Sequence, residues 1–229
     1  MTTFPAASLF DLAHTAHGRI FDGTQNAWEA IGRLGDYLAQ HLKPANHGAI
    51  EGAPFVGAQV FVGEGTVIEP GAVIKGPAWI GRNCQIRHGA YLRENVIVGD
   101  GAVLGNSCEF KNCLLFDEVQ VPHFNYVGDS ILGFRAHLGA GVILSNVRLD
   151  HAEVEVTPAD GKRLGSGLKK FGALIGDFAE IGCNAVLNPG SIIGRHGVIY
   201  PLIAWSGVLP DNTIGRAAQT LQTIARRVR

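Results

Sequence analysis

Aliphatic side chains recur at every sixth residue along most of this chain, and this period constrains the fold more than any other feature. The period runs without a slip from Val56 to Phe110, resumes twice after five-residue steps and returns once more after a long gap, making 22 hexads. The later anchors are Leu115, Val121, Val127, Leu132, Leu138, Leu144, Ile175, Ile181, Leu187, Ile193, Ile199 and Trp205. A helix would space its apolar residues three and four apart, whereas a period of six with a small residue four places after the anchor suits a short strand and a corner. Three such strands make one coil of a prism.

Composition narrows the class of protein further. The chain has 229 residues, 19 Lys plus Arg and 20 Asp plus Glu, so its net charge of −1 gives no sign of a nucleic-acid or membrane partner. No apolar run approaches the roughly 18 residues of a membrane helix, and residues 1–15 lack a secretory pattern, which predicts a cytoplasmic protein. The 31 glycines suit repeated tight corners. The four cysteines form no Cys-x-x-Cys pair, so neither a zinc site nor a disulfide framework is expected.

The hexapeptide pattern resembles that of left-handed parallel β-helix proteins. The resemblance implies an all-β fold and its handedness, and the hexads predict about seven coils. We expect an N-terminal helical cap over 1–54, the β-helix over 55–213 with a projecting loop at 148–170, and a C-terminal helix over 214–229. In the first region, apolar residues at helical spacing after Thr24 predict a helix that ends at Pro44 and packs on the first coil. Both helices are expected to cap the open ends of the prism.

Residues three hexads apart stack on one face of adjacent coils, so the repeat brings distant cations together. Lys75, Arg93 and Lys111 follow successive anchors of one column, and Tyr126 and Asn146 belong to its next two coils. Such a ladder suits a phosphate, held by guanidinium, ammonium and phenol. The alternative is a solvated ion-pair ladder in which Glu109 neutralises Lys111.

His123 lies on the strand whose corner leads to Tyr126, which makes it a candidate general base beside this phosphate-sized site. His88 shares its column but lies two coils away, too far for one metal ion to bind both, and metal catalysis is not expected. Gly139, Ala140 and Gly141 offer backbone N–H groups to an oxyanion, although glycine corners occur throughout the repeat.

Several segments resemble the acetyltransferase domain of the bifunctional glucosamine-1-phosphate acetyltransferase/N-acetylglucosamine-1-phosphate uridylyltransferase family. They are Arg93, GNSCEFK at 105–111, HFNYVGD at 123–129, LGAG at 138–141 with Asn146, and 170–177. The resemblance implies that His123 takes a proton from the sugar amine as it attacks the thioester of acetyl-CoA, and that Asn146 and Ala140 serve the reacting centre. The residues expected to bind the sugar phosphate are Arg93, Lys111, Tyr126 and Lys170.

The resemblance also implies a homotrimer with sites between neighbours, and acetyl-CoA along the later coils, near Ala140, Cys183 and Pro201. Two positions depart from the family: His137 replaces an asparagine of the sugar site, and Cys183 replaces a serine near the coenzyme. The nucleotidyltransferase domain is not expected here, because no glycine-rich nucleotide loop precedes the repeats. We therefore expect an N-acetyltransferase acting on a hexosamine 1-phosphate, preferably glucosamine 1-phosphate. The alternatives are an acyltransferase for a nucleotide-linked amino sugar and a non-catalytic sugar-phosphate-binding or assembly module.

Overall fold

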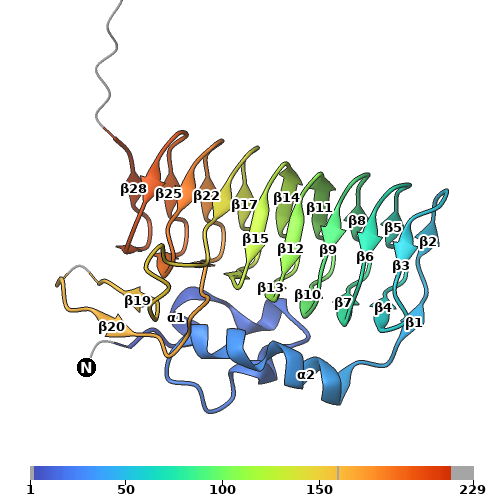
Figure 1. Cartoon of the computed structure of the whole chain (residues 1–229), viewed down its shortest axis with the longest axis horizontal. Coiled ribbons are helices and arrows are strands. Elements are labelled where there is room, and N and C mark those ends of the chain that lie inside the picture. The colour runs from blue at the N-terminus through green and yellow to red at the C-terminus, as the bar shows by residue number, and fades with distance from the viewer. Residues whose placement is uncertain (1–2, 159, 218–229) are drawn as a thin grey trace, which may run out of the picture.

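Three parallel β-sheets form the sides of a long prism in the computed structural model, which describes residues 3–158 and 160–217 (Figure 1). The chain visits the sheets in turn, so each strand pairs with the strand one coil earlier and one coil later. The predicted all-β, left-handed parallel β-helix is confirmed. The predicted coil number was too low, because the sheets hold nine, nine and eight strands, which corresponds to about nine coils.

We name the three long sheets A, B and C. Sheet A contains β1 (Ala45–Asn46), β4 (Val60–Val62), β7 (Ala78–Ile80), β10 (Val96–Val98), β13 (Cys113–Leu115), β16 (Ile131–Leu132), β21 (Ala173–Ile175), β24 (Ser191–Ile193) and β27 (Val208–Leu209). Sheet B contains β2 (Ala49–Ile50), β5 (Val67–Ile68), β8 (Gln85–Ile86), β11 (Val103–Asn106), β14 (Gln120–His123), β17 (His137–Leu138), β22 (Glu180–Ile181), β25 (Val198–Ile199) and β28 (Ile214–Gly215). Sheet C contains β3 (Phe55–Val56), β6 (Val73–Ile74), β9 (Tyr91–Leu92), β12 (Glu109–Lys111), β15 (Tyr126–Gly128), β18 (Ile143–Leu144), β23 (Val186–Leu187) and β26 (Ala204–Trp205).

The register of the strands turns the six-residue period into columns. In sheet C, Ile74 pairs with Leu92 and Leu92 with Phe110, and all three side chains are fully buried in the prism. Because side chains alternate across a strand, the residues on either side of each anchor point outward. At the corner from sheet C to sheet A, Asn112 and Asp129 take left-handed conformations with φ of 47° and 48°, a region that Asn and Asp enter more readily than other non-glycine residues.

Sheet A is buried on both faces, unlike the other two sheets. Its outward column includes Ile97, Leu114 and Ile131, each 0% exposed. They are covered by the N-terminal segment, residues 3–44, which runs along the side of the prism (Figure 1). The segment contains α1 (Ala6–Leu9), three 3₁₀ helices (Leu12–His14, Gly18–Phe21 and Ala27–Arg33) and α2 (Leu34–His41).

This segment is fastened at both edges of sheet A. At the sheet A to sheet B corner, the Phe10 ring packs on Phe116 with centroids 5.1 Å apart. At the other corner, Trp28 packs on Phe171 with centroids 6.0 Å apart. The segment thus lies on a side of the prism rather than on its first coil, where we expected it. The predicted start at Thr24 also moves, because Asn26 and Glu29 form a capping box.

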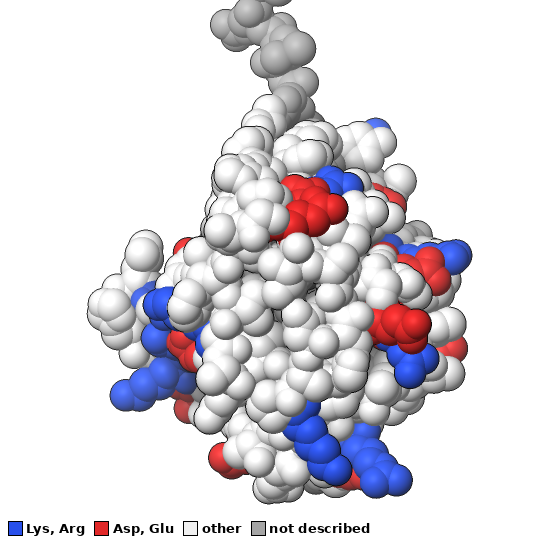
Figure 2. Space-filling model, turned by 90° about the vertical axis from the view of Figure 1, so that its right-hand side faces the viewer, with Lys and Arg blue, Asp and Glu red and all other residues white. Residues whose placement is uncertain are grey.

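The first-coil end of the prism remains open in the described structure. Viewed from that end, the charged side chains lie mainly around the periphery and the centre is uncharged (Figure 2). Ile50 is 47% and Phe55 58% exposed there. The expectation that the N-terminal helix caps this end is therefore wrong, because the apolar side of the N-terminal segment belongs to the same buried cluster as the outward column of sheet A.

The expected projecting loop contains a two-stranded antiparallel hairpin, β19 (Glu155–Val156) and β20 (Leu164–Gly165). The hairpin leaves the prism after β18 and lies beside the N-terminal segment (Figure 1). The predicted C-terminal helix over 214–229 begins instead with strand β28, and residues 218–229 lie outside the described residues. In the described ranges, no helix combines the length and apolar character that a membrane crossing requires.

Candidate active site

The outer face of sheet C and its two corners carry most of the predicted site residues. Lys111 ends β12, Tyr126 begins β15, and Asn146 follows β18 at the corner. The three residues come from consecutive coils, since Phe110 pairs with Val127 and Val127 with Leu144. The structure therefore brings this part of the predicted ladder together.

A buried carboxylate that the sequence analysis had not singled out lies at the centre of this group. Asp129 is 3% exposed, and the Lys111 ammonium lies 3.3 Å from both of its oxygens. Asn112 donates to Asp129 Oδ1 at 2.9 Å, and Asn146 donates to Asp129 Oδ2. The Asn146 amide also lies 3.2 Å from the Tyr126 hydroxyl. We call Lys111, Asn112, Tyr126, Asp129 and Asn146 the Asp129 cluster.

Two cations of the predicted ladder, Arg93 and Lys111, are each paired with a neighbouring carboxylate. Arg93 pairs with Glu109 at 3.1 Å, and this hydrogen bond raises the pKa of the guanidinium. Glu109 thus pairs with Arg93 rather than with Lys111, whose partner is Asp129. Lys75 lies 5.2 Å from the centroid of the Tyr91 ring, a cation–π distance. Arg93 and Lys111, which we predicted to bind an anion, therefore also form ion pairs with carboxylates, as the alternative interpretation expected of the ladder.

Burial shapes the acid–base character of the phenol in the cluster. Burial raises the pKa of Tyr126, and the nearby Asp129 carboxylate adds to this effect. The Tyr126 hydroxyl therefore stays protonated near neutral pH and can donate a hydrogen bond to an anionic ligand.

His123 and the three residues predicted near the coenzyme form one column at the corner from sheet B to sheet C. The backbone of each next coil confirms the alignment: Gly141 N–H donates to the His123 carbonyl, Asn184 N–H to the Ala140 carbonyl and Leu202 N–H to the Cys183 carbonyl. The column thus runs from His123 through Ala140 and Cys183 to Pro201, one coil per step of roughly 4.8 Å. His123 itself is exposed.

Two further predicted acceptor residues are not part of the Asp129 cluster: His137 lies on another face, and Lys170 lies beside the cluster. His137 is on the outer face of sheet B, where its Nδ1 lies 2.7 Å from Glu180 Oε2. Within one chain it therefore does not face the cluster on sheet C. Lys170 is exposed at the end of the hairpin loop. Its neighbour Phe171 donates its N–H to the Asn146 carbonyl at 2.9 Å, which places Lys170 next to the cluster.

The four cysteines differ in burial. Cys84, Cys108 and Cys113 are buried, and burial raises the pKa of each thiol, to about 11 for Cys84. Cys183 is exposed in the His123 column. In residues 3–158 and 160–217, no group of three His, Cys, Asp or Glu side chains is placed to hold a metal ion.

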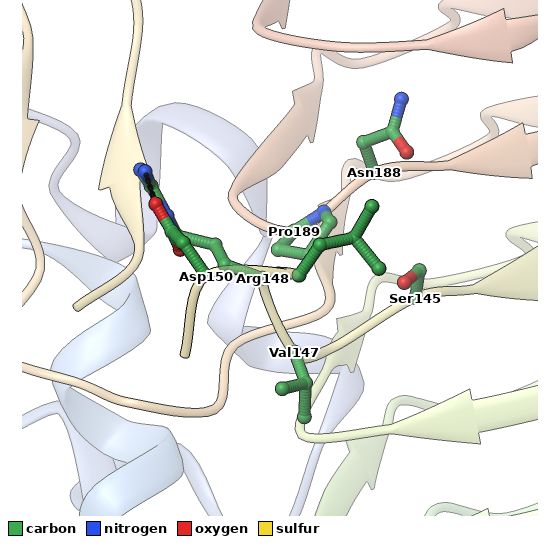
Figure 3. A pocket seen from close by; sticks show the side chains of 7 residues that line it. Ser145, Val147, Arg148, Asp150, Asn188 and Pro189 are labelled. Atoms are coloured by element: carbon green, nitrogen blue, oxygen red, sulfur yellow. Dashed lines mark hydrogen bonds and ion pairs between the residues drawn. The ribbon is translucent and has the colours of Figure 1, made fainter. Parts of the chain in front are cut away.

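A hollow of about 490 Å³ lies beside Asn146, between the later coils and the base of the hairpin loop. Figure 3 shows Ser145 and Asn188 on the strand side of the hollow, and Arg148 and Asp150 on the side of the loop. Asp150 holds Arg148 by a hydrogen-bonded pair that lowers the carboxyl pKa and raises the guanidinium pKa. The lining is Ser145, Val147, Arg148, Leu149, Asp150, Asn188 and Pro189.

Sequence reasoning missed Asp129 and this hollow for different reasons. Aligning the hexads through their slips puts Asp129 between Asn112 and Asn146 at one corner, so a sequence signal for it existed. The hollow depends on where the hairpin loop folds, and no repeat governs that loop.

The parallel β-helix is the fold that the sequence resemblance implied. The model of the GMPPB C-terminal domain family matches residues 74–159. A bifunctional sugar-1-phosphate nucleotidylyltransferase/acetyltransferase from Sulfurisphaera tokodaii is 40% identical over 95 residues, 42% of this chain and 23% of the relative. The bifunctional protein GlmU from Methanococcus maripaludis is 38% identical over 172 residues, 75% of this chain and 41% of the relative.

The chain thus spans less than half of the length of these curated relatives. Among solved structures, the acetyltransferase domain of PglB from Neisseria gonorrhoeae, in complex with acetyl coenzyme A, is 19% identical with a TM-score of 0.38. That match covers 68% of this chain and 57% of the other. The sequence relatives confirm the predicted resemblance to the bifunctional nucleotidyltransferase/acetyltransferase family.

Proposed function

We propose that the chain transfers acetyl from acetyl-CoA to the amine of a hexosamine 1-phosphate, with glucosamine 1-phosphate as the preferred acceptor. The observation that carries the proposal is the Asp129 cluster, because it gathers an ammonium, a phenol and a carboxamide on the face that Arg93 and Lys170 flank. These donors suit a sugar phosphate. The His123 column, one corner away, supplies a general base and a path for a coenzyme.

In the proposed reaction, His123 accepts a proton from the sugar amine while the amine nitrogen attacks the thioester carbon. The new C–N bond forms as the carbonyl π electrons move to oxygen, and the backbone N–H of Ala140 stabilises that oxyanion. The oxyanion electrons then re-form the C=O bond as the C–S bond breaks, and the leaving thiolate takes up the proton that His123 accepted from the amine. The products are the N-acetylated sugar phosphate and free coenzyme A.

We further propose that the active enzyme is a trimer with its sites between neighbouring prisms. The position of His137 supports this proposal, since it faces away from the Asp129 cluster of its own chain. In a trimer, sheet B of one prism can face sheet C of the next. The acceptor would then contact His137 of one copy and Asn146 of another.

The test is release of free thiol from acetyl-CoA, scanned over glucosamine 1-phosphate, glucosamine 6-phosphate, galactosamine 1-phosphate and UDP-linked amino sugars. We expect His123→Ala to lower kcat by roughly 10² to 10⁴. His88→Ala is the matched control, because His88 is exposed in the same column two coils earlier, and it should retain turnover. Full turnover by a folded His123→Ala protein would remove the base from the scheme. If no acceptor supports thiol release, the proposed reaction is contradicted and a sugar-phosphate-binding module is favoured.

A nucleotide-linked amino sugar is the second candidate acceptor, and the hollow beside Asn146 favours it. Its volume of about 490 Å³ and its mixed apolar and polar lining would admit a group attached beyond the sugar phosphate. Leu149, fully exposed at this hollow, offers a test. If the hollow is used, Leu149→Ala should raise KM for a UDP-linked amino sugar severalfold and leave KM for glucosamine 1-phosphate unchanged.

A further inference from the structure

The Asp129 carboxylate is buried, charged and surrounded by residues to which the proposed function gives roles, although it has none itself. We propose that Asp129 is a positioning residue, which sets the places of the Lys111 ammonium and the Asn146 amide and, through Asn146, of the Tyr126 hydroxyl. This inference rests on the proposed function, because it concerns how the acceptor site is held in shape.

The backbone does not require a carboxylate at this corner. Asn112 occupies the same position one coil earlier with φ of 47°, nearly the 48° of Asp129. An asparagine would therefore satisfy the turn equally well. Burial of a charged carboxylate is costly unless donors surround it. Three side chains donate hydrogen bonds to Asp129 and so offset the cost of burying its carboxylate: Lys111, Asn112 and Asn146.

The contacts with Asp129 fix the positions of the Lys111 ammonium and the Asn146 amide. Lys111 is a long side chain that would otherwise sample many rotamers, yet its side chain is only 14% exposed and its ammonium contacts both Asp129 oxygens. An ammonium carries three N–H groups, so pairing with one carboxylate leaves donor capacity for an acceptor. Asn146 is oriented too, because its Nδ2 atom faces Asp129 Oδ2 and the Tyr126 hydroxyl.

Gly128 provides the space in which these groups meet. A Cβ atom added there would lie 2.5 Å from the Tyr126 hydroxyl oxygen and 2.8 Å from Asn146 Nδ2. Both are the far ends of flexible side chains, so Gly128→Ala should displace the two polar groups while the fold persists. This variant disturbs the arrangement without changing the charge of Asp129.

The experiment compares Asp129→Asn with Asp177→Asn, a matched control outside the proposed site. Asp177 is also 3% exposed, lies 3.5 Å from Arg195, and accepts backbone N–H groups of Asp11 and Phe134. Both variants lose one buried charge. Turnover is measured with glucosamine 1-phosphate and expressed per coenzyme-binding site, counted by calorimetric titration with desulfo-CoA, so that partial unfolding cannot imitate a loss of positioning.

We expect Asp129→Asn to lower kcat per binding site by roughly 10- to 100-fold, as misplacement of about 1 Å can do, with KM for acetyl-CoA unchanged. Gly128→Ala should show the same pattern, and Asp177→Asn should keep kcat per site within about twofold. Full activity per site in both Asp129→Asn and Gly128→Ala overturns the inference while the proposed function stands. A wild-type protein that acetylates none of the acceptors removes the proposed function and this inference with it.

Discussion

The outer faces of sheet A and sheet C have the same backbone repeat and opposite roles. In sheet A the outward residues are apolar and buried, whereas in sheet C they are largely polar or aromatic and partly open to solvent. The compared columns are Ile97, Leu114, Ile131, Leu174 and Ile192 in sheet A, and Tyr91, Glu109, Tyr126, Ile143 and Val186 in sheet C. The repeat builds the prism with its inward anchors, so the outward residues are left to decide whether a side binds the rest of the chain or a ligand.

The largest predicted effect on stability concerns isoleucine, which occurs on the outer faces of both sheet A and sheet C. Ile131 is 0% exposed on sheet A, and Ile143 is 36% exposed on sheet C. We expect Ile131→Ala to lower the free energy of unfolding by about 2 to 5 kcal/mol, since it removes buried methyl groups and leaves a cavity. Ile143→Ala should cost less than about 1 kcal/mol. Urea denaturation measures both, and equal losses would contradict the assignment of the two faces.

A smaller, pH-dependent effect is expected under the N-terminal segment. His17 is 5% exposed, packs edge-on against Trp79 of sheet A and lies 3.2 Å from the Tyr37 hydroxyl. Burial lowers its pKa from 6.5 to about 4, with a further lowering by His41 and an opposing effect of Asp100. The unfolded chain therefore binds the proton more readily than the folded one. This contribution to stability is complete above pH 6.5 and is lost as the pH falls towards 4.

At one pKa unit per 1.36 kcal/mol, this loss reaches about 3 kcal/mol at pH 4. His17→Gln should flatten the fall in unfolding free energy between pH 7 and pH 4. His47→Gln serves as the control, because His47 is an exposed histidine on the first coil, and it should keep the wild-type slope. An unchanged slope in His17→Gln would show that other groups cause the pH dependence.

The smallest effect is expected for the ion pair on the open face. Arg93 and Glu109 are 35% and 37% exposed, so solvent and salt screen their attraction. Glu109→Gln should change the free energy of unfolding by less than about 1 kcal/mol in a urea titration. A loss above about 2 kcal/mol would mean that sheet C depends on its outward charges for stability, as sheet A depends on its apolar column.

The sequence predicted the prism because a period of six is produced by the inward anchors alone, and these are local features of each strand. It also predicted the column of sheet C, so Lys111, Tyr126 and Asn146 come together as expected, with Lys111 and Asn146 both contacting Asp129. The strands of the end coils were not counted, because Asn46 of β1 and Gly215 of β28 are not aliphatic, Leu209 of β27 follows Trp205 by four residues instead of six, and the count began at Val56 although Ile50 of β2 fits the period.

The N-terminal segment was placed wrongly for a different reason. Its amphipathic spacing indicates that an apolar side must be buried but does not say against which surface. The sequence did contain the answer on the other side of the contact, since sheet A strands such as Ala78–Ile80 and Val96–Val98 are uninterrupted apolar runs, which are typical of strands buried on both faces. The role of Asp129 required both the register and the side-chain directions.

Asn112 gives the molecule a mechanical link that neither face has alone. Its one amide nitrogen donates to Asp129 Oδ1 at 2.9 Å and lies 3.3 Å from the carbonyl of Ile31 in the N-terminal segment. The Asn112 side chain thus connects the N-terminal segment, which covers the outer face of sheet A, to the Asp129 carboxylate at the edge of sheet C. A change that weakens the packing of the N-terminal segment on sheet A should therefore also disturb the acceptor site, although the Asp129 cluster contains no residue of that segment.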